Sequence, residues 1–174
     1  MRGVTGDHYF TAEPDAATAG AERTVEFAAG GHEFRLQAAG GVFSAYRLDQ
    51  GTGVLLRKAD LPGPASAGTF LDLGCGYGPI ASVLATLAPE ATVYAVDVNA
   101  RARALTAANT ASLGVRVCAP DEVDEAVRFD EIWSNPPIRI GKTELHALLA
   151  HWLPRLAPGG VAWLRRARSG RPQQ

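Results

Sequence analysis

A glycine-rich turn, residues Gly74–Gly78 (Gly-Cys-Gly-Tyr-Gly), joins two apolar segments of this chain. Residues 69–73 before it have the length and composition of a buried strand. Residues 79–88 after it have a helical pattern, with proline in the first turn. A strand, a glycine turn and a helix form the first crossover of nucleotide-binding α/β folds, because glycine allows a tight turn and a close approach of ligand to backbone. The turn therefore predicts an α/β fold that binds a ligand at this loop.

Further strands and helices alternate along the rest of the chain. We expect strands at 92–96, 115–118, 129–134 and 161–164, and helices at 100–112 and 143–156. Such alternation predicts a Rossmann-like parallel sheet with helices on both faces. Near the N-terminus, residues 24–28 and 33–37 alternate apolar and polar side chains around Gly30-Gly31, which predicts a β-hairpin.

The length of 174 residues indicates one domain. We expect an irregular arm at 1–23, a domain at 24–164 and a basic, disordered tail at 165–174. Within the domain, residues 24–60 form an N-terminal extension and 69–164 form the Rossmann-like core.

Composition excludes several classes of protein. The formal net charge of -1 does not suit a polycation that coats nucleic acid. Cys75 and Cys118 are the only cysteines, too few and too far apart for a disulfide framework or a metal site. We expect no metal, no membrane span and no signal peptide, since no apolar stretch reaches ~18 residues. A cytoplasmic location is the expectation that follows.

Acidic residues near the turn indicate the kind of ligand. The spacing is Gly-x-Gly-x-Gly rather than the Gly-x-Gly-x-x-Gly of dinucleotide sites, and Asp72 lies two residues before the first glycine. A carboxylate there repels phosphate and suits a cationic ligand such as a sulfonium. Asp97 ends the next strand, about 20 residues on, where such folds hold ribose hydroxyls. Asp97 or Asn99 could instead cap the next helix, which is the favoured role for Asn99. Asp121, after the third strand, could accept the adenine amino group or be a solvated loop acid.

The turn Ser134–Pro137 (Ser-Asn-Pro-Pro) follows the fourth strand, at the same edge of the predicted sheet. An amide or exocyclic amino nitrogen is a weak nucleophile, because its lone pair is delocalised. The Asn135 side-chain oxygen and the Pro136 carbonyl are acceptors for its two hydrogens. Pro137 stiffens the turn, so the acceptors act by orientation and electrostatics. Asn-Pro-Pro alone is more often a structural turn; its position one strand past the ligand motifs favours chemistry.

Three segments together resemble class I methyltransferases: residues 71–80, 96–99 and 134–142. They are similar to the "methyltransferase small domain" group, which includes small-subunit ribosomal RNA guanine-N2 methyltransferases. Residues 8–10, 41–44 and 49–52 also match that group, so the resemblance covers roughly 7–164. It implies a class I methyltransferase sheet from which the family's last strands are missing, since the family continues past 164 with a helix and two strands.

The resemblance also implies S-adenosylmethionine as cofactor and assigns residues to the site. Phe43 and Thr52 would border the pocket. Ile138 stands where many amino methyltransferases place an aromatic residue that stacks on the base. Arg139 could touch substrate phosphate or lie in a solvated loop. The candidate cofactor-binding residues are Asp72, Gly74, Cys75, Gly76, Gly78, Asp97, Asn99 and Asp121.

The function predicted is methylation of an exocyclic amine, with guanine N2 of ribosomal RNA as the leading substrate and RNA as the partner. DNA adenine and protein glutamine are rival substrates, because similar Asn-Pro-Pro turns serve them. A cofactor-binding domain without activity is a rival of another class. An NAD-dependent oxidoreductase is disfavoured by the position of the third glycine. The oligomeric state is left open.

Overall fold

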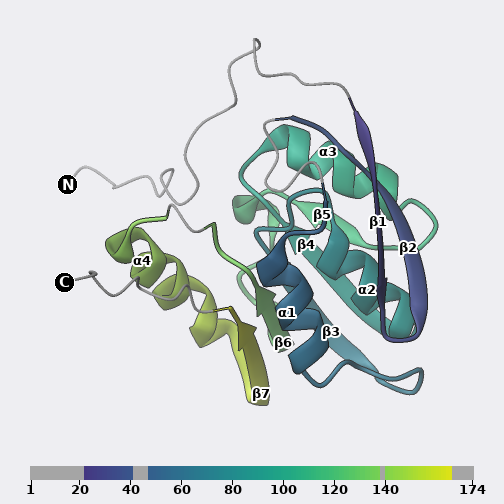
Figure 1. Cartoon of the computed structure of the whole chain (residues 1–174). Coiled ribbons are helices and arrows are strands. Elements are labelled where there is room, and N and C mark those ends of the chain that lie inside the picture. Colours follow the sequence, from purple (N-terminus) through teal and green to yellow (C-terminus); the bar gives the residue numbers. More distant parts are fainter. Residues whose placement is uncertain (1–21, 41–46, 138–139, 166–174) are drawn as a thin grey trace, which may run out of the picture.

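A parallel five-stranded sheet forms the centre of the computed structural model, which describes residues 22–40, 47–137 and 140–165 (Figure 1). The strand order is β5-β4-β3-β6-β7, so the chain moves outward one way through β4 and β5 and the other way through β6 and β7. The strands are β3 (Gly68–Leu73), β4 (Ala91–Val96), β5 (Arg116–Cys118), β6 (Phe129–Ser134) and β7 (Leu156–Leu164).

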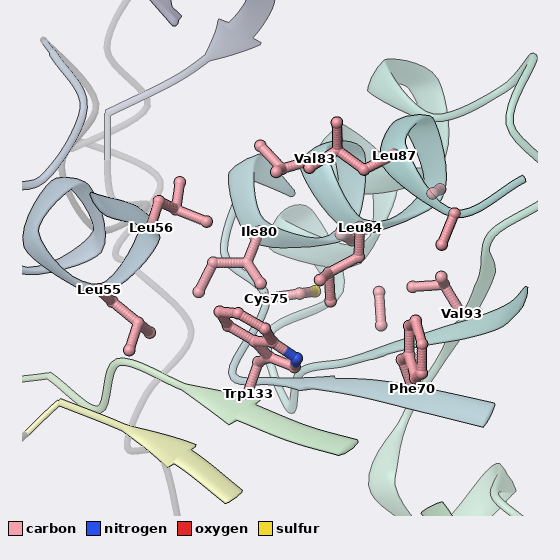
Figure 2. Packing of buried hydrophobic residues seen from close by; sticks show 14 of the residues in the cluster. Leu55, Leu56, Phe70, Cys75, Ile80, Val83, Leu84, Leu87, Val93 and Trp133 are labelled. Carbon is pink, nitrogen blue, oxygen red and sulfur yellow. The ribbon is translucent and has the colours of Figure 1, made fainter. Parts of the chain in front are cut away.

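Helices cover both faces of this sheet because side chains alternate along each strand. On one face, Phe70 and Trp133 pack against the first two helices, and Figure 2 shows Trp133 pointing from β6 toward Ile80 of α2. On the other face, Leu71 and Ile132 pack with the last helix through its buried Trp152. The helices are α1 (Gln50–Lys58), α2 (Pro79–Leu87), α3 (Ala100–Asn109) and α4 (Lys142–Trp152), with 3-10 turns η2 (Pro120–Glu122) and η3 (Leu153–Arg155).

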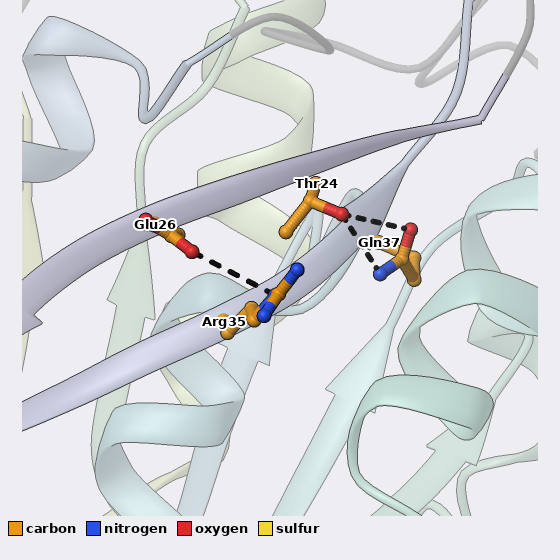
Figure 3. A network of polar contacts seen from close by, with 4 residues as sticks. All are labelled: Thr24, Glu26, Arg35 and Gln37. Carbon is orange, nitrogen blue, oxygen red and sulfur yellow. Dashed lines mark hydrogen bonds and ion pairs between the residues drawn. The ribbon is translucent and has the colours of Figure 1, made fainter.

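An antiparallel hairpin, β1 (Arg23–Ala29) and β2 (His32–Ala38), lies over α2 and α3 (Figure 1). Its inner face packs apolar side chains such as Leu36 against Leu105 of α3. Its outer face is polar, with cross-strand pairs at Thr24 and Gln37 and at Glu26 and Arg35 (Figure 3). These exposed pairs contribute little stability.

Asn109 at the end of α3 ties the hairpin to the glycine turn. Its Oδ1 accepts from the Gln37 backbone N–H at 2.9 Å, and its Nδ2 donates to the Gln37 carbonyl at 2.9 Å. The same Nδ2 donates to the Tyr77 carbonyl at 2.8 Å. The Tyr77 side chain is buried between the hairpin and α3.

The predicted fold class is confirmed: a Rossmann-like α/β sheet with an N-terminal hairpin. Two helix ends were predicted too late by more than one residue. The helix expected to reach residue 112 ends at Asn109. The helix expected through Leu156 ends at Trp152, and β7 begins at Leu156 rather than at 161. Pro154 explains the second difference, because proline has no N–H to donate within a helix.

Helix α1 was not predicted. Gly51 and Gly53 lower its helix propensity, since glycine loses more backbone entropy on folding than other residues. The signals that could have shown it are an N-cap, Asp49, whose side chain accepts from Thr52 N, and two basic residues in the last turn. Burial of Leu55 and Leu56 against the sheet stabilises it.

Candidate cofactor and substrate site

The glycine turn and the Asn-Pro-Pro turn lie side by side at the carboxyl edge of the sheet. The first follows β3 and the second follows β6, and these strands are neighbours from which the chain moves outward in opposite directions. Ser134 Oγ donates to the Leu73 carbonyl at 2.8 Å and joins the two strand ends. Ligands of open α/β sheets bind at such a switch point.

Left-handed backbone conformations shape the glycine turn. Gly74, Gly76 and Gly78 have φ of 75°, 57° and 95°, which residues with a Cβ rarely adopt. A Cβ on Gly78 would lie 3.0 Å from Thr106 Cγ2, so the turn also needs the space. The turn therefore depends on glycine for its backbone conformation, and at Gly78 also for the space that a side chain would fill.

Asp97 is built into this turn. One carboxylate oxygen accepts from Gly76 N at 3.0 Å and the other from Asn99 N at 2.9 Å. Burial raises the pKa of Asp97, and the two backbone N–H groups oppose that rise. The carboxylate is thus fixed at the end of β4, beside the glycines.

Asp72 is buried more completely, with 1% of its surface exposed. Its Oδ2 accepts from Ala81 N, in the first turns of α2, at 2.9 Å. Its Oδ1 is buried and has no hydrogen-bond partner within the described part of the chain. Burial raises the pKa of Asp72 to about 7; the Ala81 hydrogen bond opposes this and the charge of Asp97 adds to it. An orphaned, desolvated carboxylate oxygen fits a cofactor that carries positive charge.

Asn135 is also buried, with 9% exposed. Its Nδ2 donates to Asp49 Oδ2 at 2.5 Å and to Thr52 Oγ1 at 3.0 Å, both at the N-terminus of α1. A hollow brings these groups together with the glycine turn. It is lined by Asp49, Thr52, Asp72, Gly74, Cys75, Tyr77, Pro79, Ile80 and Asn135.

The structure thus adds Asp49 to the predicted site. In the sequence Asp49 is only part of a segment that matches the family, because its contact with Asn135 joins residues 86 positions apart. Pro136 and Pro137 follow Asn135 and are half-buried. Phe43, Ile138 and Arg139 lie outside the described residues.

Three other predicted residues lie as follows. Asn99 caps α3, with Oδ1 accepting from Ala102 N at 2.9 Å. Asp121 is exposed in η2, just after β5. Cys75 is buried, and burial raises the pKa of its thiol well above the usual range. Burial and a raised pKa both disfavour a nucleophilic thiolate at Cys75.

A larger hollow, of about 660 Å³, lies between α1 and β7. None of the predicted site residues lines it. Among residues 22–40, 47–137 and 140–165, no cluster of His, Cys, Asp and Glu is placed to hold a metal ion, and no helix is long and apolar enough to cross a membrane.

A parallel sheet with a Gly-x-Gly-x-Gly turn and buried acids at its switch point is the arrangement found in class I methyltransferases, the class that uses S-adenosylmethionine. The family model "Methyltransferase small domain" matches residues 33–170. The chain belongs to the methyltransferase small domain family. This confirms the predicted family and enzyme class, and with them the predicted cofactor.

The chain is also similar in sequence to the following proteins. The chain is 33% identical over 164 residues to protein YbxB of Bacillus subtilis (strain 168), an alignment covering 91% of this chain and 80% of YbxB. It is 37% identical over 136 residues to ribosomal RNA small subunit methyltransferase C of Serratia proteamaculans, covering 74% of this chain and 38% of that protein. The chain thus spans little more than a third of the length of that curated relative.

Solved structures show the same fold. The T. thermophilus 16S rRNA N2 G1207 methyltransferase (RsmC), in complex with AdoMet and guanosine, matches with a TM-score of 0.69 and 26% identity over 82% of this chain and 41% of its own. TrmN from Thermus thermophilus matches with a TM-score of 0.51 and 29% identity over 64% of this chain and 36% of its own.

Proposed function

We propose that this chain transfers a methyl group from S-adenosylmethionine to the exocyclic N2 of a guanine in small-subunit ribosomal RNA. The observation that most directly supports this proposal is that Asn135 and residues of the glycine turn line the same hollow. The similarity to RsmC, solved with AdoMet and guanosine, supports guanine as the base. A cytoplasmic location, where ribosomal RNA is found, belongs to the same proposal.

Bound S-adenosylmethionine supplies an electrophilic methyl group on a sulfonium. In the proposed arrangement the backbone of Gly74, Gly76 and Gly78 would hold the cofactor, and Asp97 would accept from its ribose hydroxyls. Asp72 offers its orphaned oxygen to the positive charge. Cys75 fills space behind the turn, and Asn99 and Asp121 border the adenosine.

Asn135 and Pro136 act on the substrate. The Asn135 Oδ1 and the Pro136 carbonyl accept from the two hydrogens of the amine, which localises the nitrogen lone pair toward the methyl group. Transfer would join this nitrogen to the methyl carbon with loss of the carbon–sulfur bond, the neutral thioether would be the leaving group, and the amine would give a proton to solvent. Pro137 limits movement of the turn. Phe43, Ile138 and Arg139 are proposed to contact the RNA.

Methyl transfer from tritiated S-adenosylmethionine to RNA, DNA and protein fractions tests this function. We expect label in small-subunit ribosomal RNA, recovered as N2-methylguanosine after digestion. Label in adenine of DNA or in glutamine of protein would replace the substrate proposal with that alternative. Bound cofactor without transfer to any fraction would indicate a domain without activity.

The role of Asn135 is tested with Asn135→Ala. Losing one of two acceptors that act on the transition state should lower kcat by roughly 100-fold, with cofactor affinity unchanged within about threefold. Gln37→Ala is the matched control, because it removes an exposed side-chain amide on the outer face of the hairpin. Equal rates for Asn135→Ala and wild type would refute the role.

A further inference from the structure

The side chain of Asn135 is held by its nitrogen. Nδ2 carries two hydrogens, and two acceptors lie within hydrogen-bond distance: Asp49 Oδ2 at 2.5 Å and Thr52 Oγ1 at 3.0 Å. A carboxylate can only accept, so Asp49 forces the amide nitrogen to face α1. The oxygen Oδ1 is then the group that Asn135 has left to offer a ligand.

Asp49 is itself held by the helix that it caps. The Thr52 backbone N–H donates to Asp49 Oδ2 at 2.9 Å, the same oxygen that receives the Asn135 amide. The N-terminus of a helix stabilises negative charge, because its first N–H groups have no partner within the helix. Helix α1 therefore keeps an acceptor of fixed direction next to the Asn-Pro-Pro turn.

We propose that Asp49, with Thr52, is a positioning residue that holds Asn135 with its Oδ1 directed to the substrate amine. This inference rests on the proposed function and extends it from the turn to α1. Without the two acceptors the side-chain amide of Asn135 could rotate by half a turn and present a donor, which repels an amine N–H. Donation to a carboxylate also polarises the amide and makes Oδ1 a stronger acceptor.

A purely structural role is the rival explanation, in which the contact only anchors α1 to the sheet. The variant Asp49→Ser distinguishes the positioning role of Asp49 from this structural role. Serine is as good an N-cap as aspartate, so α1 keeps its cap, but the shorter side chain does not reach Asn135. Asp49→Asn is the conservative variant: it caps α1 and keeps a neutral acceptor of the same length. Thr52→Val removes the second acceptor at nearly constant volume.

We expect kcat to fall roughly tenfold or more in Asp49→Ser, because hydrogen bonds to charged groups are among the stronger ones. Asp49→Asn should recover part of that loss, and Thr52→Val should lose less than Asp49→Ser. Cofactor affinity should stay within about threefold in all three. Asp60→Asn, which removes an exposed carboxylate just after α1, is the matched control and should have the wild-type rate.

A double-mutant cycle with Asn135→Ala tests whether Asp49 acts through Asn135. In that background Asp49→Ser should change kcat less than about twofold, since the group it positions is gone. An equal loss in both backgrounds would assign Asp49 a structural role. Wild-type kcat in Asp49→Ser alone, with an active parent, would overturn the positioning role and leave the proposed function standing.

A spectroscopic measurement decides the geometry even if no RNA is methylated. In the folded chain the side-chain amide of Asn135, assigned by its absence in Asn135→Ala, should give two proton resonances that exchange slowly with solvent and whose chemical shifts differ from those of an exposed asparagine amide. Both should move toward the values of an exposed amide in Asp49→Ser. A free-amide signal already present in the wild type would refute the inference; absent methyl transfer with a held amide would refute only the function.

Discussion

Asp72 gives a prediction whose magnitude follows from the structure. Burial raises the pKa of Asp72 from 3.8 to about 7. At any pH where Asp72 is ionised in the unfolded chain, folding must therefore desolvate its carboxylate or protonate it. Below pH 3.8 the group is neutral in both states and costs nothing. The penalty grows as pH rises from 3.8 and is complete above about 7. At 1.4 kcal/mol per pH unit, it amounts to about 4 kcal/mol.

Asp72→Asn removes this pH dependence, because the amide is neutral at every pH. Its carbonyl can still accept from Ala81 N, as the Asp72 carboxylate does. Relative to wild type, the variant should therefore gain roughly 2–3 kcal/mol of unfolding free energy between pH 5 and pH 8. Any constant cost from burying the amide N–H cancels in that difference.

Urea unfolding of both proteins at several pH values, without cofactor, measures the effect. The two profiles of unfolding free energy should diverge as pH rises. Parallel profiles from pH 5 to pH 8 would refute the statement that Asp72 ionises at a cost in the folded chain. Cofactor binding adds a check: a cationic ligand favours the ionised carboxylate, so affinity should fall as pH drops below about 7, and should fall more steeply in wild type than in Asp72→Asn.

Two further predictions concern the glycine turn. Gly78→Ala should cost more unfolding free energy than Gly31→Ala in urea melts: both residues have positive φ, but an added Cβ would lie 3.0 Å from Thr106 Cγ2 at Gly78 and would meet nothing within 4 Å at Gly31. Equal losses would mean that the space is not needed. Cys75 should resist iodoacetamide in the folded chain and react only after unfolding, since it is buried and its pKa is raised; alkylation at native rates typical of free thiols would contradict this.

Local signals in the sequence were enough for the sheet and its turns. Glycines at positive φ, apolar strands and the Gly30-Gly31 hairpin are each encoded within a few residues. The capping role of Asn99, too, follows from its place before a helix. These elements could be predicted because neighbours along the chain determine them.

What could not be predicted depends on contacts between distant residues. Helix α1 contains two glycines, so its intrinsic helix propensity is too low to predict it from sequence. The helix forms because Leu55 and Leu56 are buried against the sheet. The hydrogen bond from Asn135 to Asp49 can form only once α1 has packed against the sheet. The charge argument for Asp72 foresaw a cationic ligand, but the isolation of its Oδ1 is a property of the folded core.

The side chain of Asn109 has a consequence for how the molecule opens. It holds the backbone of Gln37 in the hairpin and the carbonyl of Tyr77 in the glycine turn at once. We therefore expect the hairpin and the turn to open together in native-state hydrogen exchange, with loss of the hairpin releasing the turn. The exchange rates of the hairpin amides should then report the stability of the glycine turn as well as that of the hairpin.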